Sequence, residues 1–145
     1  MLEEFIYKVY QTDPSNPNLA TVPVGTTQLQ ILFLNTNVCF NKNLALMGEK
    51  SDPGGQLEYL RSSLAQAETN SKIVWIIGNI APGSKHCNYR WAMRYNALIE
   101  RYQHIVAFQH FGNDEQEFFQ LQYPSQGTNN PFGVTFQGGK ATTLG

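Results

Sequence analysis

The sequence has no run of basic residues, few charged residues and no apolar stretch long enough to cross a membrane. Only 14% of its 145 residues are Asp, Glu, Lys or Arg, and the formal net charge is -1. Proteins that bind nucleic acid or an anionic membrane surface carry a clustered positive face. We therefore expect neither partner. The apolar stretches also fall short of the ~20 residues that a membrane-spanning helix needs, so we expect no membrane span.

Cysteine is also scarce, and the first residues lack a secretory signal. Such a signal has a basic region followed by an apolar one, whereas this sequence begins Met1-Leu2-Glu3-Glu4-Phe5. Its two cysteines, Cys39 and Cys87, are too few for a disulfide framework in a chain of this length. We interpret them as separate thiols, with a single bridge as the alternative, because spacing does not show proximity. The sequence assigns no compartment.

What the sequence does have is the length and apolar content of one soluble domain, which we predict to cover residues 1–145. With 41% hydrophobic residues, the chain can bury a core. Short apolar runs bounded by polar loops predict strands, and those at 29–34 and 73–77 are apolar enough to be buried on both faces. The predicted strands cover residues 5–10, 29–34, 73–77, 105–111, 119–123 and 132–136.

Two helices are predicted between these strands. Asp52 can cap a helix that has Pro53 at its first position, and apolar residues then recur at three- and four-residue steps to about residue 68. In a second helix, Trp91, Tyr95 and Tyr102 lie on one apolar face. Strands and helices in this order predict an α/β chain with mixed strand pairing.

Two loops that follow predicted strands carry distinctive motifs. The first is Gly78-Asn79-Ile80-Ala81-Pro82-Gly83, and the second is Phe111-Gly112-Asn113-Asp114-Glu115-Gln116-Glu117-Phe118-Phe119. They resemble the motifs GHxPPG and FGHxHxDEF of the acid sphingomyelinase-like branch of the calcineurin-type metallophosphoesterases. In that family both motifs carry metal ligands.

Four further segments resemble the same family in the same order. Residues 34–37 are similar to its LNTN strand end, 52–60 to its DPGxQxxWL helix start, and 91–102 to a W-x3-Y-x6-Y helix. Residues 132–143 are similar to the strand and small-residue loop that follow the second motif. Six segments in the family's order are hard to obtain by chance. The resemblance covers about residues 5–145.

The resemblance implies a mixed-sheet α/β/β/α sandwich, in which two sheets pack face to face and two divalent metal ions lie at the strand carboxyl ends. Family members hydrolyse phosphodiesters or phosphomonoesters with a metal-bound hydroxide. The match begins where the second half of the family begins, and the earlier Asp-x-His and GNH loops are not in the chain. We therefore expect the carboxyl-terminal half only, as a single truncated domain.

The metal ligands that the family requires are replaced in this chain. Asn79 stands at the histidine position of the first motif, and Asn113 and Glu115 stand at the two histidine positions of the second. A carboxamide oxygen binds zinc weakly in comparison with an imidazole nitrogen. We expect no catalytic residue and no cofactor. The alternative is a divalent metal ion held by Asp114, Glu115 and loop carbonyls, although a solvated turn is the simpler interpretation.

The three histidines do not supply the missing ligands. His110 lies within a predicted strand, where we expect a packed or edge position. His86 is accompanied only by Cys87, which is weak evidence for a zinc site. His104 ends a predicted helix, where the helix dipole favours a cation.

These features predict a catalytically inactive phosphoesterase-like domain that acts as a structural or interaction subunit of a larger assembly. Half of a two-sheet sandwich leaves apolar sheet surface uncovered, and such a surface is normally an interface. The expected partner is another protein chain that covers this surface. The alternative is a metal-dependent, sphingomyelinase-like phosphodiesterase, completed by a separate amino-terminal half or by a remodelled metal site.

Overall fold

A computed structural model describes residues 19–24, 27–43, 52–113, 117–125, 127 and 129–139. Within these residues the chain forms one mixed sheet of six strands and two α-helices. The α/β class and the mixed strand pairing that the sequence predicts are confirmed.

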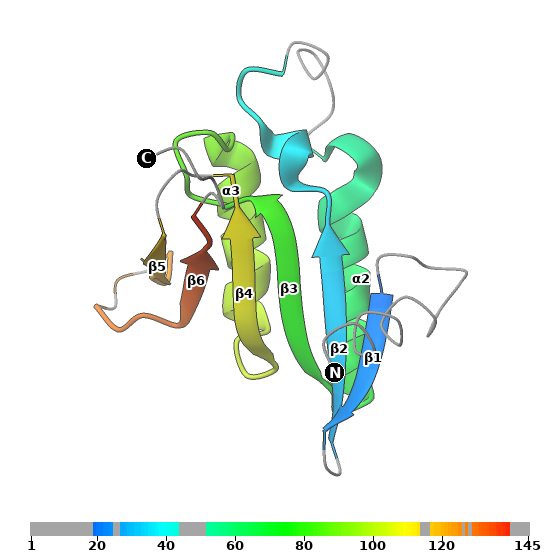
Figure 1. The fold of residues 1–145 in the computed structure, drawn as a ribbon. Helices are drawn as coiled ribbons and strands as arrows, with labels where there is room; N and C mark the ends of the chain where they lie inside the picture. Colours follow the sequence, from blue (N-terminus) through cyan, green and yellow to red (C-terminus); the bar gives the residue numbers. More distant parts are fainter. Residues whose placement is uncertain are drawn as a thin grey trace.

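The sheet has four parallel strands at its centre and an antiparallel strand at each edge (Figure 1). Its spatial order is β1-β2-β3-β4-β6-β5, and β2, β3, β4 and β6 are the parallel strands. Of the two runs predicted to be buried on both faces, residues 29–34 in β2 are all buried or half-buried, whereas in the run at 73–77 in β3 Ile73 is exposed. The strands are β1 (Leu19–Val24), β2 (Thr27–Leu34), β3 (Ile73–Ile80), β4 (Val106–Gly112), β5 (Phe118–Gln122) and β6 (Gly133–Gln137).

Both α-helices lie on the same face of the sheet, which is the far face in the view of Figure 1. They are α2 (Gln56–Thr69) and α3 (Tyr89–Arg101). The apolar stripe predicted for the first helix is buried in a core shared with β2, β3 and β4. The stripe consists of Leu57, Leu60, Leu64 and Ala67. Neither helix of the described residues is long and apolar enough to span a bilayer.

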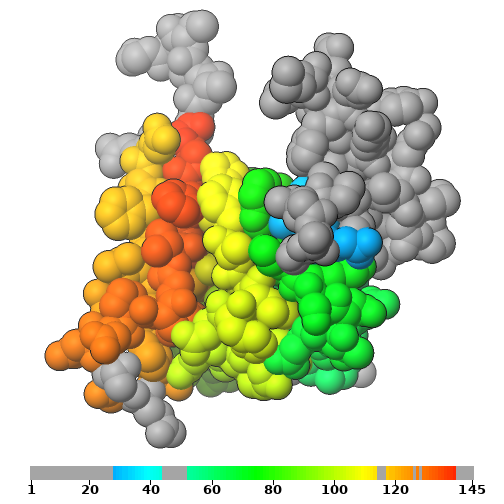
Figure 2. Space-filling view, turned by 90° about the horizontal axis from the view of Figure 1, so that it is seen from below, coloured from blue at the N-terminus to red at the C-terminus, as the bar shows by residue number. Residues whose placement is uncertain are grey.

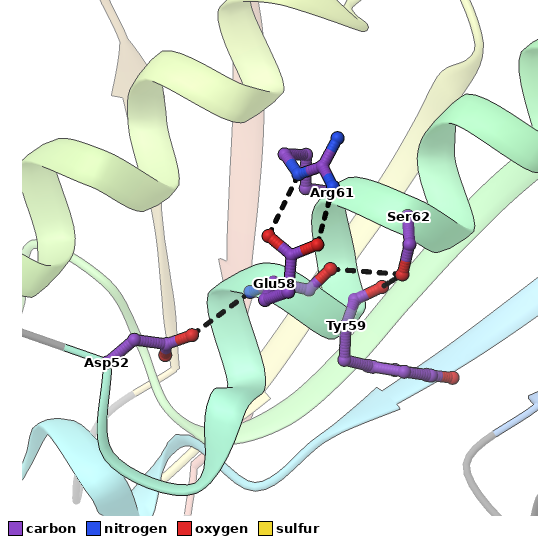
Figure 3. A network of polar contacts seen from close by, with 5 residues as sticks. All are labelled: Asp52, Glu58, Tyr59, Arg61 and Ser62. Carbon is purple, nitrogen blue, oxygen red and sulfur yellow. Dashed lines mark hydrogen bonds and ion pairs between the residues drawn. The ribbon is translucent and has the colours of Figure 1, made fainter.

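The start of α2 differs from the prediction because two glycines interrupt it. Gly54 and Gly55 have φ angles of 65° and 63°, so Pro53–Gly55 forms a separate 3-10 turn, η3. Asp52 still caps the helix: its carboxylate accepts hydrogen bonds from the backbone N–H groups of Leu57 (2.9 Å) and Glu58 (3.1 Å). Figure 3 shows the hydrogen bond between Asp52 and the Glu58 N–H group and the exposed Glu58–Arg61 ion pair. The hydrogen bond from Arg61 lowers the pKa of Glu58.

Two further differences concern strands. β1 was not predicted, and the strand predicted at residues 5–10 lies outside the described residues. β3 runs three residues beyond the prediction to Ile80, so it contains Gly78 and Asn79 of the first motif. The remaining strands and α3 begin and end within two residues of the predicted bounds.

The interpretation of Cys39 and Cys87 as separate thiols is wrong, because the two form a disulfide with their Cα atoms 4.8 Å apart. A 3-10 turn after β2, η1 (Thr36–Cys39), directs the chain toward the loop that precedes α3. There the N–H group of Asn88 donates a hydrogen bond to the Cys39 carbonyl over 2.6 Å, and Phe40 makes a β-bridge to Cys87. This long-range pairing brings together cysteines that are 48 residues apart in sequence.

Candidate functional site

The carboxyl ends of the central strands β2, β3 and β4 lie side by side at the top of Figure 1. We call this end of the strands the carboxyl edge of the sheet. In open α/β sheets this edge is where ligands usually bind. It contains residues 35–37 after β2, Asn79 at the end of β3 and Asn113 after β4. The positions singled out in the two motifs therefore lie on adjacent strands.

Thr36 joins the first two of these strand ends. Its buried hydroxyl oxygen accepts hydrogen bonds from the backbone N–H groups of Asn79 (3.0 Å) and Ile80 (2.7 Å). The side chain of Thr36 has no accessible surface. These two bonds satisfy donors at the point where the register between β3 and β4 becomes irregular. Thr36 thereby fixes the backbone that carries Asn79.

The Asn79 carboxamide itself forms a hydrogen bond at the carboxyl edge of the sheet. Its Nδ2 group donates a hydrogen bond to Asn37 Oδ1 over 2.8 Å. The preceding residue, Gly78, leaves room for Phe111 on β4: an added Cβ would lie 2.7 Å from Phe111 Cε1. Asn79 and Asn37 therefore form an amide pair that links two strand ends.

Asn113 follows β4 and is exposed, with a φ angle of 71° that asparagine tolerates better than most residues. Asp114 and Glu115, the residues proposed for an alternative hard-ion site, lie outside the described residues. Glu117 is described and exposed.

The described side chains at the carboxyl edge of the sheet do not fit as ligands of a pair of zinc ions. Zinc sites are built from thiolate, imidazole and carboxylate groups. In the described part of the chain, no cluster of three or more His, Cys, Asp or Glu side chains has the arrangement to hold a metal ion. Asn37, Asn79 and Asn113 present neutral amides instead.

The histidines lie elsewhere in the structure. His110 is half-buried in β4 and its ring stacks on Phe108 with 6.0 Å between centroids, which agrees with the packed position predicted for it. His104 Nε2 lies 2.9 Å from a carboxylate oxygen of Glu68, beyond the end of α3. His86 precedes the disulfide, with its ring 6.3 Å from that of Phe40.

A second candidate site is the sheet face opposite the helices, which we call the helix-free face. Phe108 lies at its centre, with ring centroids 5.3 Å from Trp75 and 5.4 Å from Phe136. No helix of the described residues covers it (Figure 1). From cluster membership, ring contacts and strand register, its members are Leu29, Ile31, Phe33, Trp75, Ile77, Phe108, His110, Val134, Phe136, Phe119 and Leu121.

The exposed part of the helix-free face lies on the last two strands. Phe119, Leu121 and Phe136 keep 63%, 43% and 43% of their surface exposed. Their strands adjoin one another, with Phe119 directly opposite Phe136 in the register. Figure 2 shows the molecule from below, where the segments of β5, β6, β4 and β3 follow one another from orange and red through yellow to green. Several large apolar side chains on one sheet face thus have no described cover.

Two structural features near this site were not predicted from the sequence. Thr36 belongs to the segment that resembles LNTN, but nothing in the sequence shows that its hydroxyl bonds to the neighbouring strand. The Cys39–Cys87 bridge was only the alternative to two separate thiols, since its only signal in the sequence is the presence of two cysteines. Both features depend on contacts between distant segments.

Comparison with known proteins finds no matching family model. The chain is 36% identical over 115 residues to the sphingomyelin phosphodiesterases of Bos taurus and Homo sapiens, a match that covers 79% of this chain. It is 29% identical over 152 residues to sphingomyelinase phosphodiesterase C of Dictyostelium discoideum, which covers 93% of this chain. The chain spans only 18% of the length of each mammalian relative and 34% of the Dictyostelium one.

Proposed function

We propose that this chain is a catalytically inactive phosphoesterase-like domain. The chain is homologous over most of its length to part of the sphingomyelin phosphodiesterases and acid sphingomyelinase-like phosphodiesterases. It acts as a structural or interaction subunit of a larger assembly. The observation that carries this proposal is the helix-free face, a sheet surface of aromatic and aliphatic side chains with exposed members on β5 and β6.

In this proposal the chain is a single domain that provides one sheet and one helical layer of an α/β/β/α sandwich. Two α-helices cover one face of its sheet, as the outer layer of such a sandwich would. The other face is apolar, as required of a sheet that packs against a second sheet about 10 Å away. The relatives are several times longer than this chain, so they contain residues beyond the matched region.

The partner in this proposal is another polypeptide that contributes an apolar sheet surface. Burying one phenylalanine side chain contributes about 2 kcal/mol. The exposed Phe119, Leu121 and Phe136 together therefore favour association over solvation. Electrostatic attraction contributes little to this association, because these three side chains carry no charge.

The loss of activity in this proposal follows from the strand-end residues. Asn79 and Asn113 occupy histidine positions of the resembled motifs, and Asn79 already donates to Asn37. Glu115 occupies the third position. Neutral amides hold a transition metal poorly without stronger companion ligands. A chain without the metal pair lacks the electrophile that the resembled hydrolases use.

Sedimentation velocity of the purified chain tests the interaction role. We expect concentration-dependent association, because Phe119, Leu121 and Phe136 of the helix-free face are exposed in the single chain. Phe136→Asp, which places a charge on that face, should shift the equilibrium toward the monomer. Tyr89→Asp is the matched control, since Tyr89 is an aromatic residue of α3 that is 74% exposed and lies away from the face. A chain that stays monomeric at every concentration would count against the proposal.

A second candidate function is a metal-dependent phosphodiesterase, completed by a separate amino-terminal half or by a remodelled site that uses Asp114 and Glu115. The names of the relatives favour this alternative. It is tested by assaying the chain with a phosphodiester substrate and divalent metal ions. Turnover that Glu115→Ala abolishes, together with stoichiometric metal, would replace the inactive assignment.

A further inference from the structure

A polar cavity of about 460 Å³ lies beside edge strand β5, on the side of the sheet that carries the helices. The loop after β3 supplies Pro82 and Gly83, α3 supplies Asn96, and the β5 region supplies the rest. We call it the glutamine cavity. Its lining residues are Pro82, Gly83, Asn96, Gln120, Leu121, Gln122 and Tyr123. Its volume is within the range of small-molecule sites.

The orientation of the polar groups in the cavity is set by a chain of buried hydrogen bonds. The Tyr95 hydroxyl donates to Gln109 Oε1 (2.8 Å), and Gln109 Nε2 donates to Gln122 Oε1 (2.6 Å). Gln122 Nε2 then donates to Asn96 Oδ1 over 3.0 Å. Burial raises the pKa of Tyr95 well above its ordinary value, so the phenol keeps its proton and remains a donor.

This chain of bonds leaves polar groups available at the cavity. Asn96 Oδ1 accepts the hydrogen bond from Gln122, whereas Asn96 Nδ2 has no hydrogen-bond partner among the described residues. The half-buried Gln120 makes no side-chain hydrogen bond within the described part of the chain. Half-buried amide groups of this kind cost free energy unless something forms hydrogen bonds with them.

The chemistry of the lining selects a neutral ligand. None of the lining residues carries a charge at neutral pH. Carboxamides both donate and accept, so Gln120 and Asn96 suit hydroxyl groups, which do the same. Tyr123, which is 51% exposed, adds an aromatic surface beside them. A ligand with a rim of hydroxyl groups and an apolar ring face matches this arrangement.

We propose that the glutamine cavity binds a carbohydrate, in the form of a single pyranose unit contacted by Gln120, the Asn96 amide and the Tyr123 ring. Gly83 is part of the same site. It has a φ angle of 98°, and an added Cβ would lie 3.4 Å from Gln120 Oε1, so a side chain there would crowd the Gln120 amide. This inference is independent of the proposed loss of hydrolase activity.

The test is NMR titration of the isotope-labelled chain with the methyl glycosides of glucose, galactose, mannose and N-acetylglucosamine. We expect saturable shifts of the Asn96, Gln120 and Gln122 side-chain amide signals with at least one of them, in the millimolar range. Gln120→Leu should weaken binding roughly tenfold, the effect of losing one or two hydrogen bonds. Gln103→Leu makes the same change at an exposed position beyond α3 and should leave binding unchanged.

A second variant separates recognition from folding. Asn96→Asp keeps an oxygen to accept the hydrogen bond from Gln122, but it removes the amide donor. It should therefore weaken sugar binding while the amide spectrum of the fold is retained. Absence of saturable shifts with all four glycosides would overturn the proposal, and so would unchanged binding in both Gln120→Leu and Asn96→Asp.

Discussion

Gly78 is the residue at which the strand-end geometry is least tolerant of change. An added Cβ would lie 2.7 Å from Phe111 Cε1 and 3.0 Å from Thr36 Cγ2, and the side chain of Phe111 is fully buried. We predict that Gly78→Ala lowers the free energy of unfolding by about 1–3 kcal/mol, the usual range for overpacking. Urea denaturation measures this change.

The matched control for that variant is Gly112→Ala on β4. There the nearest atom to an added Cβ is the Asn79 carbonyl oxygen, at an ordinary contact distance of 4.0 Å. Gly112→Ala should therefore change stability much less than Gly78→Ala. Equal losses in the two variants would show that close approach to Phe111 is not what requires glycine at position 78.

Thr36 makes the second residue-scale prediction. Thr36→Val keeps the shape of the side chain but removes the acceptor for the Asn79 and Ile80 N–H groups. We expect a loss of about 2 kcal/mol, because an unsatisfied buried donor costs its desolvation. Thr36→Ser retains the hydroxyl and should lose less in the same denaturation experiment. If serine were as destabilising as valine, the two hydrogen bonds would not be the stabilising feature.

At the scale of elements, the Cys39–Cys87 disulfide holds the turn after β2 against the loop before α3. It closes a segment of 48 residues that contains α2 and β3. By loop-closure entropy, we predict that reducing it lowers the free energy of unfolding by about 4 kcal/mol. Denaturation with and without a thiol reductant measures the effect.

The double variant Cys39→Ala/Cys87→Ala serves as the control for reduction, because it removes the bridge without a reductant. Its unfolding midpoint should fall to near that of the reduced protein. Oxidised and reduced proteins with the same midpoint would mean that hydrogen bonds such as Asn88 N–H to the Cys39 carbonyl hold the two loops together without the bridge.

Most elements could be predicted from local patterns. α2 and α3 follow from apolar residues at helical spacing, and β2 follows from its nearly continuous apolar run. β1 was missed because its sequence, Leu19–Val24, is short and contains Pro23. Proline is tolerated on an edge strand, which β1 is. Gly25-Thr26 follows it directly, and such a Gly-X pair between two strands is a hairpin signal that could have revealed it.

The candidate site was less predictable than the elements. The two motifs were predicted to follow strands, and the structure places Asn79 and Asn113 at the carboxyl ends of β3 and β4, which are adjacent in the sheet. The bond from Asn79 to Asn37 and the disulfide each join residues more than forty positions apart. Local sequence patterns do not encode such contacts, because they depend on the register of the whole sheet.

At the scale of the whole molecule, the helices cover only one face of the sheet (Figure 1). An apolar surface without cover is expected from the resemblance to half of a sandwich. The aromatic row of Trp75, Phe108 and Phe136 gives that surface specific residues.

We propose different roles for the two faces of the sheet. The helix-free face is apolar and suits a protein partner, whereas the glutamine cavity on the helical side is polar and uncharged. Phe136→Asp and Gln120→Leu therefore separate the two, since each changes a residue on one face only. Association and sugar binding should be lost independently of each other.

The central claim, that the strand ends have lost the metal pair of the resembled hydrolases, is tested most directly by zinc binding. Equilibrium dialysis of the purified chain against micromolar free zinc, followed by elemental analysis, measures the number of bound ions. We predict less than one zinc ion per chain, because Asn79 and Asn113 offer neutral amides where the resembled motifs have imidazoles. Two bound zinc ions, lost on changing Asn79 and Asn113 to alanine, would contradict the account.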